Sequence, residues 1–183
     1  MSGSDSSGVC PEQQSSEAQR WFDSVDQDHS GRINRMELQS ALIDCQGRKF
    51  SEIACKLMIE MFDGDHSGTI NRNEFQQLFG YVNQWVAVFE HHDKDHSGYV
   101  DERELSQALQ EMGYKLSLDF IKMLMRKCDL QNCQQVTVDQ FVVICVQIQR
   151  LTEAFRVRDK EMKGVITIGF EDFLNVALNC YVI

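Results

Sequence analysis

Residues 93–104 read DKDHSGYVDERE, in which oxygen-bearing side chains recur in a fixed order around a central glycine. The same pattern, D-x-D-H-S-G-x-[IV]-x-x-x-E, occurs twice upstream, as DQDHSGRINRME at 26–37 and as DGDHSGTINRNE at 63–74. One match of this kind could be an accident or a decayed loop, whereas three nearly identical copies indicate an internal repeat.

The oxygen atoms of each copy have the spacing of an EF-hand calcium loop. Ca²⁺ takes about six to eight oxygen ligands, and a twelve-residue loop supplies them from positions 1, 3, 5, 7, 9 and 12, position 7 through its backbone carbonyl. Glycine at position 6 permits the sharp turn that a residue with a Cβ resists. Apart from position 9, which often acts through water, the predicted ligands are Asp26, Asp28, Ser30, Arg32 and Glu37 in loop one, Asp63, Asp65, Ser67, Thr69 and Glu74 in loop two, and Asp93, Asp95, Ser97, Tyr99 and Glu104 in loop three.

We therefore predict three Ca²⁺ sites. Loop three has a further carboxylate, Asp101, at position 9, so we expect it to bind at least as tightly as the other two. Two fainter copies follow, at 129–140 and 159–170. The fourth has glutamine in place of the glycine and of the terminal glutamate, and the fifth has Lys163 at a ligand position and Phe170 at the last one. We expect neither of them to bind calcium.

The spacing of the loops predicts the helices. Loops two and three start 30 residues apart, at 63 and 93, and loops four and five repeat this interval, at 129 and 159. That interval leaves no room for two helices and a linker, so each pair of loops is expected to share one long helix. Apolar residues at helical spacing agree with this. The predicted fold is all-α: five EF-hand helix–loop–helix units with about eight helices, two of them shared, and short β-bridges between paired loops.

Residues 1–16 differ from the rest in composition, because they are rich in Ser, Gly and Gln and contain the only proline, Pro11. We interpret them as a flexible tail ahead of one five-hand domain at 17–183. The fifth hand, at about 159–183, has no partner hand within the chain. A two-fold dimer in which each fifth hand meets its counterpart would bury its apolar face, and packing on its own chain is the alternative.

Charge and cysteine content narrow the class of function. The net charge of −10 argues against nucleic acid and anionic membrane surfaces as direct partners. Seven cysteines without a CxxC spacing favour a reduced, cytoplasmic protein, with a zinc site at Cys128 and Cys133 as a weak alternative. The position-4 histidines of the three loops are expected to be solvated rather than to bind zinc or copper. The sequence has no protease, P-loop or nucleophile-elbow motif, so we expect no enzymatic activity.

Five hands, two shared helices and a fifth loop that is not expected to bind calcium resemble the penta-EF-hand family. The stretches YVNQW at 81–85, GYKLS at 113–117 and QRLT at 149–152 carry the likeness, which extends over about 17–183. The resemblance implies a homodimer, or a heterodimer, formed through the fifth hand. It also implies that calcium exposes apolar surface and recruits the protein from the cytosol to membranes or membrane-bound partners.

Three functions are compatible with these features. The first is a calcium sensor and adaptor whose apolar groove takes up apolar or proline-rich segments of partner proteins. Its candidate groove residues, for which ordinary core packing is the alternative, are Trp85, Phe89, Tyr114, Met123 and Met125. The second is a passive calcium buffer, which would not expose apolar surface. The third is the regulatory small subunit of a calpain-like protease, whose catalytic domain would lie on another chain.

Overall fold

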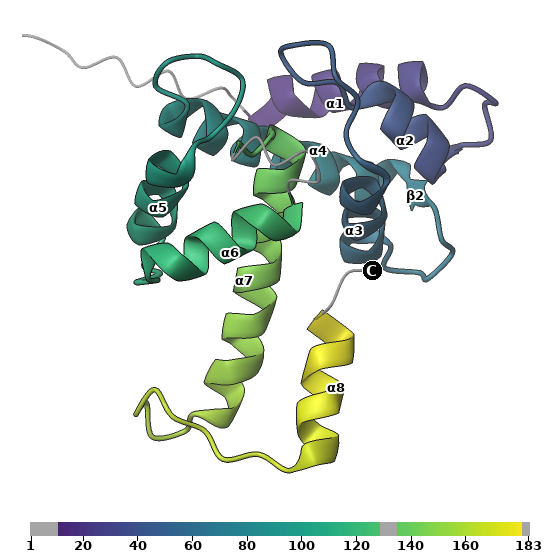
Figure 1. Ribbon diagram of the computed structural model, residues 1–183. Coiled ribbons are helices and arrows are strands. Elements are labelled where there is room, and N and C mark those ends of the chain that lie inside the picture. The colour runs from purple at the N-terminus through teal and green to yellow at the C-terminus, as the bar shows by residue number, and fades with distance from the viewer. Residues whose placement is uncertain (1–10, 129–134, 181–183) are drawn as a thin grey trace, which may run out of the picture.

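The computed structural model describes residues 11–128 and 135–180, with the backbone alone at 11–16 and 128 (Figure 1). Its helices are α1 (Pro11–Val25), α2 (Arg35–Ala41), α3 (Glu52–Phe62), α4 (Arg72–His92), α5 (Glu102–Glu111), α6 (Leu118–Cys128), α7 (Val138–Arg158) and α8 (Phe170–Cys180), and its strands are β1 (Arg32–Ile33) and β2 (Ile70–Asn71). The all-α prediction is confirmed. The two shared helices are α4, between loops two and three, and α7, between loops four and five.

The exiting helix of each calcium loop starts with a capping box built from the loop itself. At α4, the side chain of Asn71 accepts hydrogen bonds from the backbone N–H groups of Asn73 and Glu74, and the Glu74 carboxylate accepts one from the N–H of Asn71. Positions 9 and 12 of the loop are therefore also the N-cap and third residue of the helix. The same arrangement starts α2 and α5.

Loops pair through short antiparallel β-bridges, as predicted. Strand β1 pairs with β2, which places Ile33 opposite Ile70 and joins loops one and two. Val100 and Val136 exchange backbone hydrogen bonds of 2.8 and 3.0 Å and so join hands three and four. The position-8 residues that carry these bridges are fully buried. Among the described residues, loop five takes part in no bridge.

The first four hands share one apolar core, and the two shared helices meet in it. Phe141 of α7 lies against Trp85 and Phe89 of α4, with ring centroids 6.0 and 5.7 Å apart. The first half of α7 is buried along most of its length, whereas its second half and α8 are largely exposed. Figure 1 shows α7 running out of the packed helices and α8 returning beside it.

Three expectations need revision or lie beyond the described residues. Helix α1 begins at Pro11, so 11–16 are helical rather than part of a tail; proline suits a first helical turn, where its missing N–H costs nothing. Phe89 and Met125 are only 3% exposed and pack in the core, the alternative stated for them, although Phe89 also lines a pocket with Trp21 and Val82. Residues 1–10 and the Cys128–Cys133 pair lie outside the described side chains. None of the described helices is long and apolar enough to cross a membrane.

Candidate calcium sites

The aspartate at position 1 shapes each loop through backbone hydrogen bonds. In loop two, Oδ1 of Asp63 accepts from the N–H of Ser67 at 2.9 Å, and Oδ2 accepts from the N–H of Gly68 at 2.7 Å. These bonds curl the chain around the carboxylate, and they direct the carboxylate toward the centre of the loop. The equivalent pairs measure 3.0 and 2.8 Å at Asp26, and 2.9 and 2.9 Å at Asp93.

Two residues of each loop have left-handed backbone conformations. His29, His66 and His96, at position 4, have φ between 53° and 55°, and the glycines at position 6 have φ between 75° and 77°. The glycine is required because residues with a Cβ are strained there. All three histidines are exposed, in agreement with the solvated role expected for them.

The glutamate at position 12 turns into the loop. In loop two, Oε1 of Glu74 accepts from the N–H of Gly64 at 3.0 Å, and Oε2 from the N–H of Asn71 at 2.8 Å. Loops one and three repeat these contacts at Glu37 and Glu104. In loop one the carboxylates of Asp26, Asp28 and Glu37, and in loop two those of Asp63, Asp65 and Glu74, offer oxygens within 4.8 Å of one another. These oxygens fit a hard divalent cation such as Ca²⁺.

The position-3 carboxylates are stabilised in their ionised form. Hydrogen bonds from Ser30 hold the pKa of Asp28 below its usual value, and those from Ser97 do the same for the pKa of Asp95. The pKa of Asp65 is lowered first by the guanidinium of Arg32 and then by Ser67. Negative carboxylates are the form that calcium requires.

The role of the Arg32 side chain was missed from the sequence, which assigned this residue only a backbone carbonyl ligand in loop one. Its guanidinium crosses to loop two, where it contacts Asp65 Oδ2 at 2.7 Å, Ser67 Oγ at 2.6 Å and Thr69 Oγ1 at 2.8 Å. Two of these atoms are predicted calcium ligands. The only indication of these contacts in the sequence is an arginine at position 7, directly before Ile33 of the β-bridge.

Loop three is held by the segment that connects hands one and two. The Gln46 side-chain amide donates to the carbonyl of Ser97, and the Arg48 guanidinium donates to the carbonyl of Gly98 at 2.8 Å. The same guanidinium lies 4.2 Å from the ring centroid of Tyr99 and pairs with Asp44 at 2.6 Å. Nothing in the loop motif predicts these contacts.

Loop five keeps the backbone conformation of a calcium loop at positions 1 to 6, but α8 begins only at position 12, whereas the exiting helices of loops one to three begin at position 10. Asp159 accepts from the N–H groups of Lys163 and Gly164 at 2.9 and 2.7 Å, and Met162 has φ of 53° at position 4. The Lys163 ammonium pairs with Glu161, and Phe170 stands at position 12 with 75% of its surface exposed. Of loop four, residues 129–134 lie outside the described chain.

A comparison with family models matches the EF-hand domain pair at residues 15–80 and 83–145. Peflin of Homo sapiens is 41% identical over 170 residues, which cover 92% of this chain and 60% of that protein. Sorcin of Schistosoma japonicum is 41% identical over 156 residues, 85% of this chain and 91% of that one. The structure of a homologue of programmed cell death 6 protein from Leishmania major Friedlin superposes with a TM-score of 0.80 at 30% identity, over 90% of both chains.

The fold and these matches define an EF-hand calcium-binding protein. Within that class, with five hands and two shared helices, the chain belongs to the penta-EF-hand family. It spans about 60% of the length of the peflins it matches.

Proposed function

We propose that this protein is a calcium sensor that dimerises through its fifth hand and binds partner proteins beside its third. The observation that carries the proposal is an apolar pocket of about 600 Å³ between the two helices of hand three. Its apolar lining comes mainly from Tyr81, Trp85 and Val88 of α4, from Ala108 of α5 and from Met112 just after it. In sensor EF-hands, calcium changes the angle between the entering and exiting helices. A pocket between these helices therefore changes shape with calcium.

An apolar or proline-rich segment is the partner chemistry that this pocket fits. Aromatic side chains line proline-rich binding grooves in other domains, and Tyr81 and Trp85 provide such a surface here. The net charge of −10 disfavours direct contact with anionic lipid, so recruitment to membranes would take place through the bound partner. The calcium loops identify neither a partner nor a catalytic reaction. We propose that the protein is an adaptor rather than an enzyme.

A cytoplasmic location is part of the same proposal. Among the described residues, Cys45, Cys55, Cys145 and Cys180 are free thiols. Burial raises the pKa of Cys55 and of Cys145 to about 12, which keeps both protonated and unreactive near neutral pH. Free thiols are typical of a reducing compartment. Fractionation of cells with and without calcium tests the location, and a pool that stays on membranes in the absence of calcium would contradict it.

The dimer is supported by the exposed face of the fifth hand. Phe173 and Leu178 of α8 are 54% and 72% exposed, and Val157 at the end of α7 is 67% exposed. Hands one to four cover their apolar faces in pairs, and the fifth has no such partner among the described residues. The simplest occupant is the same face of a second copy, which closes the surface with two-fold symmetry.

The pocket is tested with an apolar fluorescent dye, titrated with calcium. Val88→Asn makes one wall of the pocket polar, and Met36→Asn is a matched control because Met36 is 77% exposed on α2 and does not line the pocket. We expect a calcium-dependent rise in dye fluorescence in the wild type and the control, and a smaller one in the Val88 variant. Calcium binding without any rise would identify a buffer instead.

The dimer is tested by sedimentation at micromolar concentration. The wild-type chain is expected at twice its monomer mass, Leu178→Asp at the monomer mass, and Met36→Asp at the dimer mass. A monomeric wild type would refute the homodimer. Recovery of a large calpain-like chain with the tagged wild-type protein would instead support the role of a regulatory subunit.

A further inference from the structure

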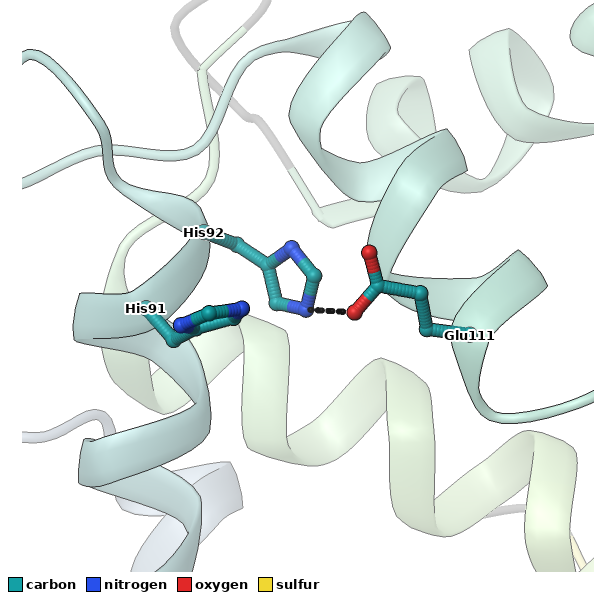
Figure 2. Close-up of side chains that lie close together, drawn as sticks. All are labelled: His91, His92 and Glu111. Carbon is teal, nitrogen blue, oxygen red and sulfur yellow. Dashed lines mark ion pairs between the residues drawn. The ribbon is translucent and has the colours of Figure 1, made fainter. Parts of the chain in front are cut away.

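Three side chains near the end of hand three form a cluster that calcium binding does not use. His91 and His92 are the last residues of α4, and Glu111 is the last residue of α5 (Figure 2). A nitrogen of each imidazole and an oxygen of the carboxylate lie within 4.8 Å of one another. All three residues line the pocket between α4 and α5. We propose that they form a Zn²⁺ site, separate from the calcium loops.

The distance between two of the ligands fits this ion better than it fits a hydrogen bond. Nε2 of His92 and Oε2 of Glu111 are 3.5 Å apart, and Figure 2 shows the two atoms facing each other. An N–H···O bond is usually about 2.7–3.2 Å long. Ligand atoms about 2.0–2.2 Å from a tetrahedral zinc are about 3.4 Å from each other. The observed gap therefore leaves space for an ion between the two side chains.

The type of ligand selects the metal. Two imidazole nitrogens and one carboxylate oxygen suit Zn²⁺, whereas Ca²⁺ and Mg²⁺ prefer oxygen ligands alone. With three protein ligands, the fourth position of a tetrahedral ion faces the pocket. A water molecule, or a donor atom of a partner segment in the pocket, would complete the coordination.

A residue outside the cluster, Gln107, orients the Glu111 carboxylate. The side-chain amide of Gln107 donates to Oε1 of Glu111 at 3.1 Å, and the Lys94 ammonium donates to the amide oxygen of Gln107 at 3.0 Å. These bonds leave Oε2 directed toward His92. Such outer partners are typical of metal sites. Nδ1 of His92 is buried without a hydrogen-bond partner among the described residues, so we expect affinity about 10–100-fold below that of a site with a complete outer shell.

Zinc binding is tested by calorimetry on the full chain, with the loops saturated by calcium and a non-chelating reductant present. His91→Gln and Glu111→Gln each remove one ligand, and both positions are exposed, so these variants are expected to fold. His96→Gln is the matched control, because His96 is an exposed histidine outside the cluster. We expect one site per chain in the wild type and the control, weakened at least about tenfold in the two ligand variants.

Equal zinc affinity in all four proteins would overturn the site. Co²⁺ provides a second measurement, because its visible absorption reports the ligands. Bands of a nitrogen and oxygen site that disappear in His91→Gln support the proposal. A thiolate-to-metal band of the same intensity in all four proteins would assign the ion to cysteine instead and overturn it.

The zinc site would also affect calcium binding by hand three. This inference rests on the proposed binding of calcium by loop three. The ion would tie the end of the entering helix to the end of the exiting helix, in the same arrangement that has Glu104 turned into the loop. Zinc and calcium therefore favour one geometry, and the coupling is reciprocal. We expect saturating zinc to raise the calcium affinity of loop three about fivefold or more.

The coupling has a readout specific to loop three. Tyr99, at position 7, is the only aromatic residue at that position in the three loops, so it sensitises Tb³⁺ bound there, and calcium displaces the Tb³⁺. Zinc should lower the calcium concentration needed for displacement in the wild type but not in Glu111→Gln. Zinc binding without this shift would overturn the coupling alone, whereas calcium that displaces no Tb³⁺ would refute calcium binding by loop three.

Discussion

Loops three and five share the backbone conformation of their first six residues but differ at later ligand positions, and the exiting helix begins at position 10 in loop three and at position 12 in loop five. Both start with an aspartate that accepts two backbone N–H groups, and both have φ of 53° at position 4, in His96 and in Met162. Loop three then presents Ser97 and Glu104 where loop five presents Lys163 and Phe170. The turn in the first half of the loop therefore comes from its first aspartate and its glycine. We expect calcium binding to depend on the other ligand side chains, so that a hand without these side chains still folds.

The largest effect is expected from removing the terminal ligand of loop three. Glu104→Gln keeps an oxygen for the capping box of α5 but loses the charge and the second carboxylate oxygen. We expect calcium affinity at loop three to fall on the order of 100-fold, because calcium depends on bidentate coordination by this glutamate. Calorimetry without zinc measures the change, with Glu111→Gln, at the last residue of the same helix, as control. Three unchanged binding phases would show that this glutamate is no ligand.

The next test restores ligands to loop five. The triple variant Glu161→Asp, Lys163→Ser and Phe170→Glu gives loop five the side chains of loop three at positions 1, 3, 5 and 12 and leaves Thr167 at position 9. We expect one additional ion per chain, at an affinity in the weak range of about 10⁻⁴–10⁻³ M. Calorimetry counts the ions, and Glu161→Asp alone serves as control. If the triple variant binds no further ion, the later start of α8, and not only the side chains, prevents calcium binding by loop five.

A smaller difference is expected between two matched glycines. Gly98 and Gly164 have φ of 75° and 70°, so alanine is strained at both, by about 1–2 kcal/mol. A Cβ at Gly98 would also collide with the Gln46 side chain, whereas at Gly164 nothing lies within 4 Å. We expect Gly98→Ala to be more destabilising in denaturant unfolding, by about 0.5–1.5 kcal/mol for the disturbed hydrogen bond. In a Gln46→Ala background the difference should disappear.

The smallest effect concerns the cation that crosses between loops. Arg32→Gln removes a guanidinium from Asp65 and Ser67, which calcium also needs. We expect the calcium affinity of loop two to rise by no more than about fivefold, because exposed ion pairs contribute little. Arg35→Gln, which removes an exposed charge that pairs with Glu52 instead, is the control. A fall in affinity would mean that the guanidinium orders the loop rather than competes with the ion.

The sequence predicted what depends on local spacing. Ligand positions, shared helices and β-bridges all follow from a twelve-residue motif and its intervals, and the fold they imply is confirmed. Contacts between distant segments were not predicted. The Arg32 guanidinium reaches a residue 33 positions away, and Gln46 reaches one 51 positions away. Such contacts depend on how hands pack, which no local pattern encodes. The three ligand sets themselves stay predictions until ions are counted.

The segment that connects hands one and two affects how steeply calcium binding depends on calcium concentration. Gln46 and Arg48 bind the carbonyls of Ser97 and Gly98, which lie between ligands of loop three. An ion that orders loop three would therefore also order the connector between hands one and two. Filling one pair should lower the threshold of the other. The protein would then bind calcium cooperatively, over a narrow range of calcium concentration and with a Hill coefficient above one.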